Sequence, residues 1–298
     1  MRKKLHDPAR LVRLTAICAV IACAPDRTTE AAGGAPADAR ATAANARATM
    51  ESPGVHRQYG PPVTLGEGKV RAYVVLDAKS EQRPLELGVA IDARAMEGSL
   101  PSPDMLMIPM SLPAQAPLPY RFVLFDWNPL GHPPAGVSDV PHFDFHFYVV
   151  PEADVEAITR DDPEFAAKAN NLPTGAFLPP LYAVSKPPGT TPAVVALPGM
   201  GVHWQDLLSP EYQRILGRPD AYQPFSKTYV YVSWDGRITA FEPMVTREYL
   251  LRRINETVPV RQPAKYAEAG WYPGAYRIEY DDHAAEYRVA LVDFAWRE

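Results

Sequence analysis

The sequence predicts a mainly β fold of the α+β class: a single antiparallel β-sandwich or barrel-like domain with short peripheral helices. Several segments alternate apolar and polar residues as strands do, and residues typical of hairpin turns separate them. Proline supplies 33 of the 298 residues. Because proline breaks helices but is tolerated in loops and at sheet edges, this content favours a strand-rich and loop-rich chain.

The predicted strands mostly form hairpins. The first hairpin folds about a polar turn over residues 79–84. The clearest one turns at Asp235-Gly236, because this is the pair that a two-residue primed turn prefers. A last pair, joined by residues 281–286, is expected to close the sheet. In chain order, strands are expected over residues 70–76, 85–91, 120–127, 142–150, 193–197, 228–234, 237–244, 276–280 and 287–294.

The helical patterns are short and are expected to lie around the sheet. Asp161 or Asp162 is a candidate cap for the second of them, Gly217 ends the third, and Thr246 precedes the last. In chain order, these helices are expected over residues 152–159, 163–170, 210–216 and 247–256.

The first residues of the chain have the pattern of an export signal. A basic start precedes an apolar run over residues 11–22, which is about half of the ~20 residues that span a bilayer. The run ends in Val-Ile-Ala-Cys, which resembles the bacterial lipobox, so Cys23 is the expected site of lipidation. The alternative is an ordinary cleaved signal with Cys23 discarded or free.

These features divide the chain into a lipoprotein signal peptide (1–22), an alanine- and threonine-rich flexible tether (23–57) and a strand-rich, metal-binding domain (58–298). The expected location is the bacterial cell envelope, with the exported chain anchored to the lipid bilayer through acylated Cys23. The last segment, of about 240 residues, is long enough to bury a sizeable core.

Composition excludes several classes of function. A net charge of −5 with both signs dispersed lacks the basic stripe of a nucleic-acid binder. No cysteine follows Cys23, so the domain has neither a disulfide framework nor a thiolate metal site. The motifs of serine hydrolases, phosphate-binding loops, zinc-binding helices and dinucleotide folds are also absent from the sequence.

A strand near the middle of the chain contains the highest density of potential metal ligands. Its alternation puts His142, Asp144 and His146 on one face and three phenylalanines on the other. Residues two apart on a strand are separated by about 6.6 Å and residues four apart by about 13 Å, so His142 and His146 reach one ion only through a bulge or bend. A regular strand would instead pair His142 with Asp144, or Asp144 with His146.

Four further residues are candidates for the same site. His203 follows a glycine-rich bend and is a candidate ligand, or else a histidine bonded in an aromatic pocket. Glu242 is a charged residue among apolar neighbours and is a candidate ligand or general base, or else a salt-bridge partner. His132 lies in a proline-stiffened loop and could ligate, shuttle protons or line the pocket. Asp139 could orient a ligand histidine or serve a turn.

The favoured hypothesis is one divalent metal ion held by His142, His146 and His203, with Glu242 as fourth ligand or base. His132 is a second candidate catalytic residue, and Asp144 and Asp139 are supporting residues or alternative ligands. Zinc fits this set best, with iron or manganese as alternatives.

The reaction would be a metal-dependent hydrolysis or hydration of a small-molecule ligand. One alternative is a non-enzymatic metal- or ligand-binding envelope protein. Another is a metal-free interaction module that presents an aromatic sheet, in which the histidines would be dispersed. The sequence leaves the oligomeric state open.

Four segments together resemble an uncharacterised bacterial family, the TTHB-type domain of unknown function, named for a Thermus protein. They read Asp-Trp-Asn-Pro-x-Gly-His-x-Pro (126–134), Pro-His-Phe-Asp-Phe-His-Phe-Tyr (141–148), Met-Gly-x-His-Trp (200–204) and Phe-Glu-Pro-Met (241–244). The resemblance covers about residues 60–246. It implies a secreted or anchored, strand-rich protein with a metal centre and names no substrate. Ser138 stands where such sequences commonly have a tyrosine ahead of Asp139.

Overall fold

The computed structural model describes residues 55–298, except for the side chains of Val55, Glu81 and Gln82. The expected signal peptide, the lipidation site Cys23 and nearly all of the expected tether therefore lie outside the described residues. Strand β1 begins at Val55, ahead of the expected domain start at residue 58. Across residues 55–298, no helix combines the length and apolar character needed to cross a membrane.

One seven-stranded antiparallel sheet contains the first and last parts of the fold. Its strands run in the order β1-β3-β4-β15-β14-β12, and β2 pairs with β3. The expected first hairpin is confirmed as β3 and β4, and the expected last pair as β14 and β15. The strands are β1 (Val55–Tyr59), β2 (Val63–Leu65), β3 (Gly68–Asp77), β4 (Ser80–Asp92), β12 (Glu256–Pro259), β14 (Ala275–Asp281) and β15 (Glu286–Val292).

A second seven-stranded antiparallel sheet is built from the middle of the chain in the order β5-β6-β7-β11-β10-β9-β8. The hairpin at Asp235-Gly236 is confirmed, and both turn residues have positive φ as a primed turn requires. The strands are β5 (Leu106–Ser111), β6 (Phe122–Asn128), β7 (His142–Tyr148), β8 (Tyr182–Val184), β9 (Val202–Asp206), β10 (Lys227–Trp234) and β11 (Arg237–Thr246). A small separate sheet pairs β13 (Gly270–Tyr272) with β16 (Ala295–Arg297).

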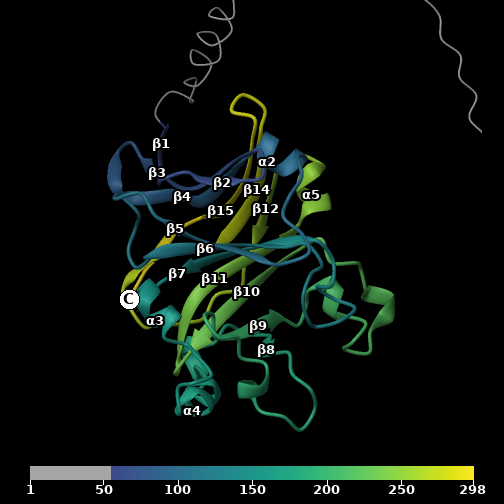
Figure 1. Cartoon of the computed structure of the whole chain (residues 1–298). Helices are drawn as coiled ribbons and strands as arrows, with labels where there is room; N and C mark the ends of the chain where they lie inside the picture. The colour runs from purple at the N-terminus through teal and green to yellow at the C-terminus, as the bar shows by residue number, and fades with distance from the viewer. Residues whose placement is uncertain (1–54) are drawn as a thin grey trace, which may run out of the picture. The chain divides into compact units, whose positions relative to one another are not determined.

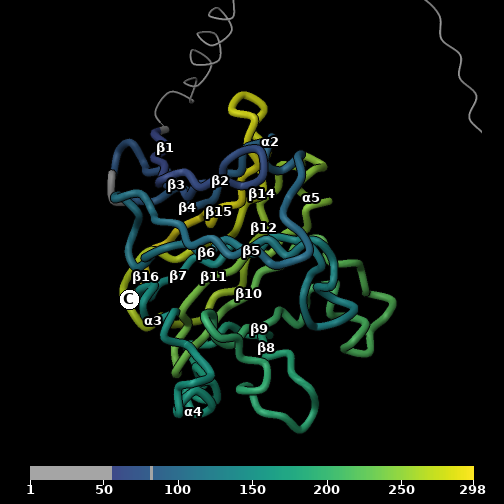
Figure 2. The backbone as a smooth tube through the Cα atoms, viewed as in Figure 1, coloured from purple at the N-terminus to yellow at the C-terminus, as the bar shows by residue number. Residues whose placement is uncertain are grey.

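The two large sheets lie as layers with an apolar core between them (Figure 1; Figure 2). Phe143, Phe145 and Phe147 point from β7 into this core and pack in one cluster with residues of the first sheet such as Val89 and Leu291. Full burial of each such side chain contributes roughly 1.5–3 kcal/mol. Within residues 55–298 neither strand order closes on itself, so the fold is an open antiparallel β-sandwich and not a closed barrel.

The helices are short, as expected, and lie outside the layers (Figure 1). Thr246 caps the last of them, because its hydroxyl accepts a hydrogen bond from the Tyr249 amide. The helices are α2 (Ala93–Glu97), α3 (Glu152–Glu156), α4 (Phe165–Asn170) and α5 (Arg247–Leu251), with single 3-10 turns η1 (Gly175–Phe177), η2 (Pro192–Val194), η3 (Pro210–Tyr212) and η4 (Pro219–Ala221).

Three local expectations were wrong. The strand expected over 193–197 is the 3-10 turn η2, since Pro192 starts a turn and Leu197 makes only an isolated bridge with Gly201. The helix expected over 210–216 is reduced to η3. The last helix ends at Leu251, because Arg253 adopts a left-handed backbone conformation with φ of 53°.

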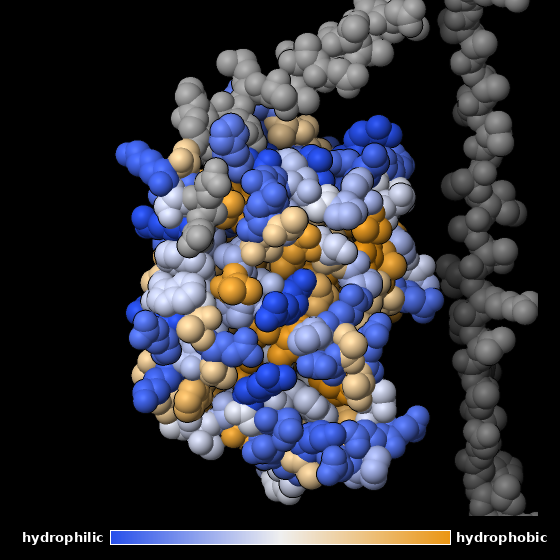
Figure 3. Space-filling view, turned by 90° about the vertical axis from the view of Figure 1, so that its left-hand side faces the viewer, coloured by the Kyte–Doolittle hydropathy of each residue, from blue (hydrophilic) through white to orange (hydrophobic). Residues whose placement is uncertain are grey.

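Apolar side chains are also exposed on the surface. On the face that Figure 3 turns toward the viewer, hydrophobic residues lie between hydrophilic ones without forming a single continuous patch. Isolated exposed apolar residues of this kind are normal for a globular domain.

Candidate metal centre

The polar face of β7 lies on the outer side of the second sheet, opposite the phenylalanine core. The pairing of β6 with β7 is regular from end to end and puts Asp126 opposite Asp144 and Asn128 opposite His142. The register of β11 with β7, in which Phe241 faces Phe147 and Met244 faces Asp144, places Glu242 opposite His146. Three adjacent strands thus present polar side chains to one outer surface.

The first candidate group, here called the Glu242 triad, contains His146, His203 and Glu242. The Nε2 atom of His146 lies 3.3 Å from Glu242 Oε1, and Nε2 of His203 lies 3.5 Å from Glu242 Oε2. The two Nε2 atoms are 3.4 Å apart. One donor atom from each residue lies within 4.8 Å of the other two, so this group could hold a metal ion.

Asp126 contacts the ring nitrogen of His146 that does not face Glu242. Its Oδ2 lies 3.2 Å from Nδ1 of His146, within hydrogen-bond reach, although the angle is poorer than in a regular hydrogen bond. A carboxylate accepts but does not donate, so it favours the proton on Nδ1 and leaves Nε2 with its lone pair facing Glu242 and His203. Carboxylates hold the ring of metal-ligating histidines in this way.

The second candidate group, here called the Asp144 triad, contains His132, His142 and Asp144. Nε2 of His142 lies 3.1 Å from Asp144 Oδ1, and Nε2 of His132 lies 3.3 Å from Asp144 Oδ2. The two Nε2 atoms are 3.0 Å apart. These donor atoms also lie within 4.8 Å of one another, so a metal ion could bind here as well.

Glycine places the two histidines that come from outside β7. Gly131 has φ of 70°, and a Cβ there would lie 2.3 Å from the carbonyl oxygen of Ser138, so only glycine lets the chain turn tightly before His132. Gly201 has φ of 122°, and a Cβ there would lie 2.6 Å from the carbonyl oxygen of Ser233. This close approach brings β9 against β10, with His203 opposite Val232.

Burial shapes the electrostatics of the Glu242 triad. Burial raises the pKa of Glu242 to about 8, although the charge of His146 acts to lower it. Burial also lowers the pKa of His203 to about 3. Burial also acts to lower the pKa of His146, but the charge of Glu242 and the contact with Asp126 outweigh it and raise that pKa to about 9. Without metal, a proton is therefore held between His146 and Glu242, while His203 is neutral.

In the Asp144 triad, too, burial and neighbouring charges have opposite effects on the pKa values. Burial acts to raise the pKa of Asp144, but the charge on His142 and the hydrogen bond from His132 hold it well below its usual range. Burial likewise acts to lower the pKa of His132, but the hydrogen bond and charge of Asp144 raise it to about 9. A cation is thus favoured in this triad as in the other.

Several buried oxygens in the two triads and in the neighbouring Asp126 have no hydrogen-bond partner among the described residues. They are Oε2 of Glu242, Oδ1 of Asp144 and both carboxyl oxygens of Asp126. A buried polar atom without a partner costs about 1–3 kcal/mol, and more when charged. Metal coordination is one way in which such atoms are satisfied.

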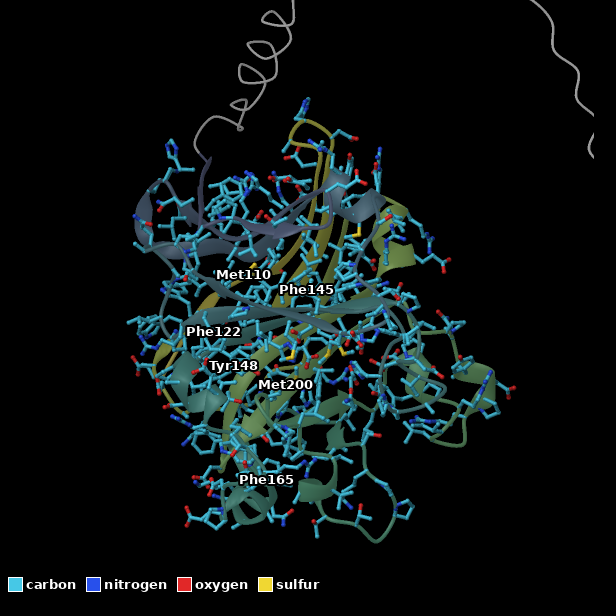
Figure 4. The ribbon with its side chains drawn as sticks, in the orientation of Figure 1. Met110, Phe122, Phe145, Tyr148, Phe165 and Met200 are labelled. Carbon is cyan, nitrogen blue, oxygen red and sulfur yellow. The ribbon has the colours of Figure 1, made fainter. Side chains whose placement is uncertain are left out.

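The outer surface around the triads is closed by apolar packing. Phe122, Tyr148 and Met200 belong to a separate cluster on this side of the second sheet, away from the core residues Met110 and Phe145 (Figure 4). The ring of Phe225 packs edge-on against His142 with centroids 5.3 Å apart. Access is greatest at the two histidines outside β7, since the side chains of His132 and His203 are 34% and 15% exposed.

The expected ligands are thus distributed differently from the single set in the hypothesis. The structure brings His146, His203 and Glu242 together, but it places His142 with His132 and Asp144. The reason is the regular register of β7, which has no bulge to turn His142 and His146 toward one point. Asp139 is exposed, and its carboxylate accepts a hydrogen bond from the Gly136 amide, as in a turn.

Sequence reasoning did not select Asp126 and Asn128, although both are buried in the site. Asn128 donates a hydrogen bond of 2.8 Å to Oδ2 of Asp144. The alternation Leu-x-Asp-x-Asn over residues 124–128 was the available signal, since it puts both polar side chains on one face of the preceding strand.

The described residues also enclose cavities away from the triads. One, of about 330 Å³, is lined by residues that include Phe177, Arg237, Tyr266, Glu268 and Tyr272, and it contains no member of either triad. Its size suits a small molecule. Among the described residues no donor set for a metal adjoins it, so this cavity and the candidate metal ligands are separate.

Comparison of the chain with family models, with curated proteins and with solved structures finds no match. Membership of the family that the sequence resembles therefore stays a prediction. The geometry of the two triads is the remaining basis for a function.

Proposed function

We propose that the protein binds a divalent metal ion through His146, His203 and Glu242. The observation that carries this proposal is the convergence of two imidazole nitrogens and a carboxylate at a buried point, with Asp126 behind His146 and no partner for Glu242 Oε2. Acceptor atoms that face one another repel unless a cation lies between them. In the metal-free protein a proton can be this cation, whereas a metal ion would satisfy all three ligand atoms at once.

Zinc is the ion we expect. Two imidazoles and one carboxylate are ligands that Zn²⁺ accepts, at distances near 2 Å, and thiolates are excluded because the domain has none. The same ligands also occur in iron sites, and manganese accepts carboxylates, so these ions are the alternatives. All three metals require His146 to release its proton, which makes the binding pH-dependent.

The ligand set favours metal-dependent hydrolysis or hydration of a small substrate as the reaction. Three protein ligands leave a position for water, whose pKa a bound divalent ion lowers toward about 7. His132 and Glu242 remain the candidate residues for proton transfer.

The burial of the Glu242 triad favours a second candidate function, a non-enzymatic metal-binding envelope protein. His146 and Glu242 are each 1% exposed. The walls of three cavities of about 270–340 Å³ in the described residues contain neither of them. In this case the ion would mainly hold the loops around the site.

Elemental analysis tests the metal function directly. The full chain is purified, loaded with zinc and passed through a desalting column. We expect it to retain one zinc per chain, and we expect His203→Ala and Glu242→Gln to lose that zinc. His283→Ala is the matched control, because His283 is exposed in a loop. Wild-type protein that retains no zinc, iron or manganese would contradict the proposal.

The two candidate functions differ in turnover. A zinc-loaded enzyme should hydrolyse a small activated ester such as 4-nitrophenyl acetate faster than the Glu242→Gln variant incubated with the same zinc concentration, because that variant does not retain the ion. Equal rates for the two proteins would favour the non-enzymatic function.

We also propose that the chain is exported and lipid-anchored at Cys23, on the basis of its N-terminal sequence. A Cys23→Ser variant should move from the membrane fraction to the soluble fraction of bacterial cells. Unchanged partitioning would reject the anchor without affecting the metal proposal.

A further inference from the structure

We propose that the Asp144 triad is a second metal site, so that β7 carries two ions side by side. For the first ion, this inference rests on the function proposed above. The second site is built from different residues: His132, His142 and Asp144 share no donor with the Glu242 triad.

The hydrogen bonds behind the two rings determine which nitrogens face the site. Nδ1 of His142 lies 2.7 Å from the carbonyl oxygen of Val140, and Nδ1 of His132 lies 2.8 Å from that of Pro133. A carbonyl only accepts, so each Nδ1 carries a proton and donates it. In the neutral rings both Nε2 atoms are therefore acceptors, and they lie 3.0 Å apart beside a carboxylate.

Three acceptors that converge in this way need a cation between them. A proton on Nε2 of His132, 3.3 Å from Oδ2 of Asp144, can be that cation in the metal-free protein. The amide of Asn128 also donates to Oδ2, so Oδ1 of the same carboxylate still has no hydrogen-bond partner among the described residues. Asp144 is 4% exposed, so solvent does not readily satisfy that oxygen. A divalent ion would be coordinated by both imidazoles and by Asp144.

Two separate ions fit better than one bridged pair. Asp144 and His146 are two residues apart on a regular strand, which separates them by about 6.6 Å. Metal pairs that act together on one substrate are about 3.5–4 Å apart. No residue contributes to both triads. We therefore infer two neighbouring mononuclear sites.

The two ions should differ in affinity. Asp126, Asp144 and Glu242 balance a first divalent ion, whereas a second one leaves this face with excess positive charge and is repelled by the first. The Asp144 triad also depends on His132, which stands on a loop and is 34% exposed, more than the 15% of His203. The Asp144 triad should thus hold the weaker and faster-exchanging ion.

A titration with Co²⁺ tests this inference, because its absorption spectrum reports each coordination site. The full chain, freed of metal by a chelator, should bind two equivalents, the second at least tenfold more weakly than the first. His132→Ala and His142→Gln should remove only the weaker equivalent. His203→Ala should remove the tighter one, and His283→Ala should leave both.

The other possible outcomes of the titration would overturn different parts of the proposal. One equivalent that survives in His132→Ala and His142→Gln would overturn the second site and leave the first intact. One equivalent that is lost in both His142→Gln and His203→Ala would show a single shared ion and overturn the two-site inference. Absence of binding in the wild type would overturn both proposals. Circular dichroism of every variant excludes misfolding, and His132→Ala provides a loop variant that does not disturb the core.

Discussion

The two faces of β7 bury their side chains almost equally but with opposite consequences. Phe143, Phe145 and Phe147 are fully buried in the core between the sheets, where removal from water stabilises the fold. On the other face, His142, Asp144 and His146 are also buried, at 0%, 4% and 1% exposure, and there burial costs free energy until a cation is present. Burial alone therefore does not separate structure from function, whereas unsatisfied buried charge does.

The largest expected effect is on the apolar face. Phe145→Ala should lower the free energy of unfolding by about 3–5 kcal/mol, because it removes a fully buried ring and leaves a cavity. Urea denaturation, with and without zinc, measures this. The loss should be the same in both conditions, since the ring does not face the triads. A loss that depends strongly on zinc would break the division between the two faces.

An intermediate effect is expected behind the Glu242 triad. Asp126→Asn should weaken the tighter metal equivalent about 10- to 100-fold, because the carboxylate that orients His146 is replaced by a neutral amide. Competition with a chelating dye measures the affinity. Asp139→Asn is the matched control and should leave it unchanged, as Asp139 is exposed and bonds only within its turn. Equal weakening in both variants would indicate that Asp126 has no specific role.

The smallest expected effect is that of pH on the polar face. The folded pKa of His132 and of His146 is about 9, above the ordinary histidine value near 6.5, and that of Glu242 is about 8, above its ordinary value. Groups with a raised pKa stabilise the fold while protonated and lose that contribution as pH rises through the folded value. Metal-free protein should therefore become less stable between pH 6.5 and 9.

Zinc should oppose this trend, because fewer protons have to be displaced from the histidines as pH rises. The low pKa of His203, about 3, acts in a different window: its contribution is present above about pH 6.5 and is lost as pH falls toward 3. Urea midpoints at pH 4.5, 6.5 and 8.5, with a chelator or with micromolar zinc, measure both trends. A His132→Gln, His146→Gln double variant that kept the same pH dependence in the chelator would contradict this account.

Much of the fold could be predicted from the sequence. The alternation of β7, the hairpin at Asp235-Gly236 and the cap at Thr246 all rest on local rules of strand period, turn conformation and helix capping. The same rules failed where prolines begin short turns, as at Pro192. In the site, the sequence identified five residues that now lie in one or other triad, and it also raised Asp144 as an alternative ligand.

The polar and apolar faces of β7 therefore follow from the sequence alone, because side-chain direction along a strand depends only on its period of two. The grouping of the ligands, in contrast, depends on how the strands and loops come together in the fold. The register of β11 puts Glu242 opposite His146, and the loop after Gly131 brings His132 to His142. Such contacts depend on long-range pairing and loop closure, and neither leaves a periodic signal in the chain.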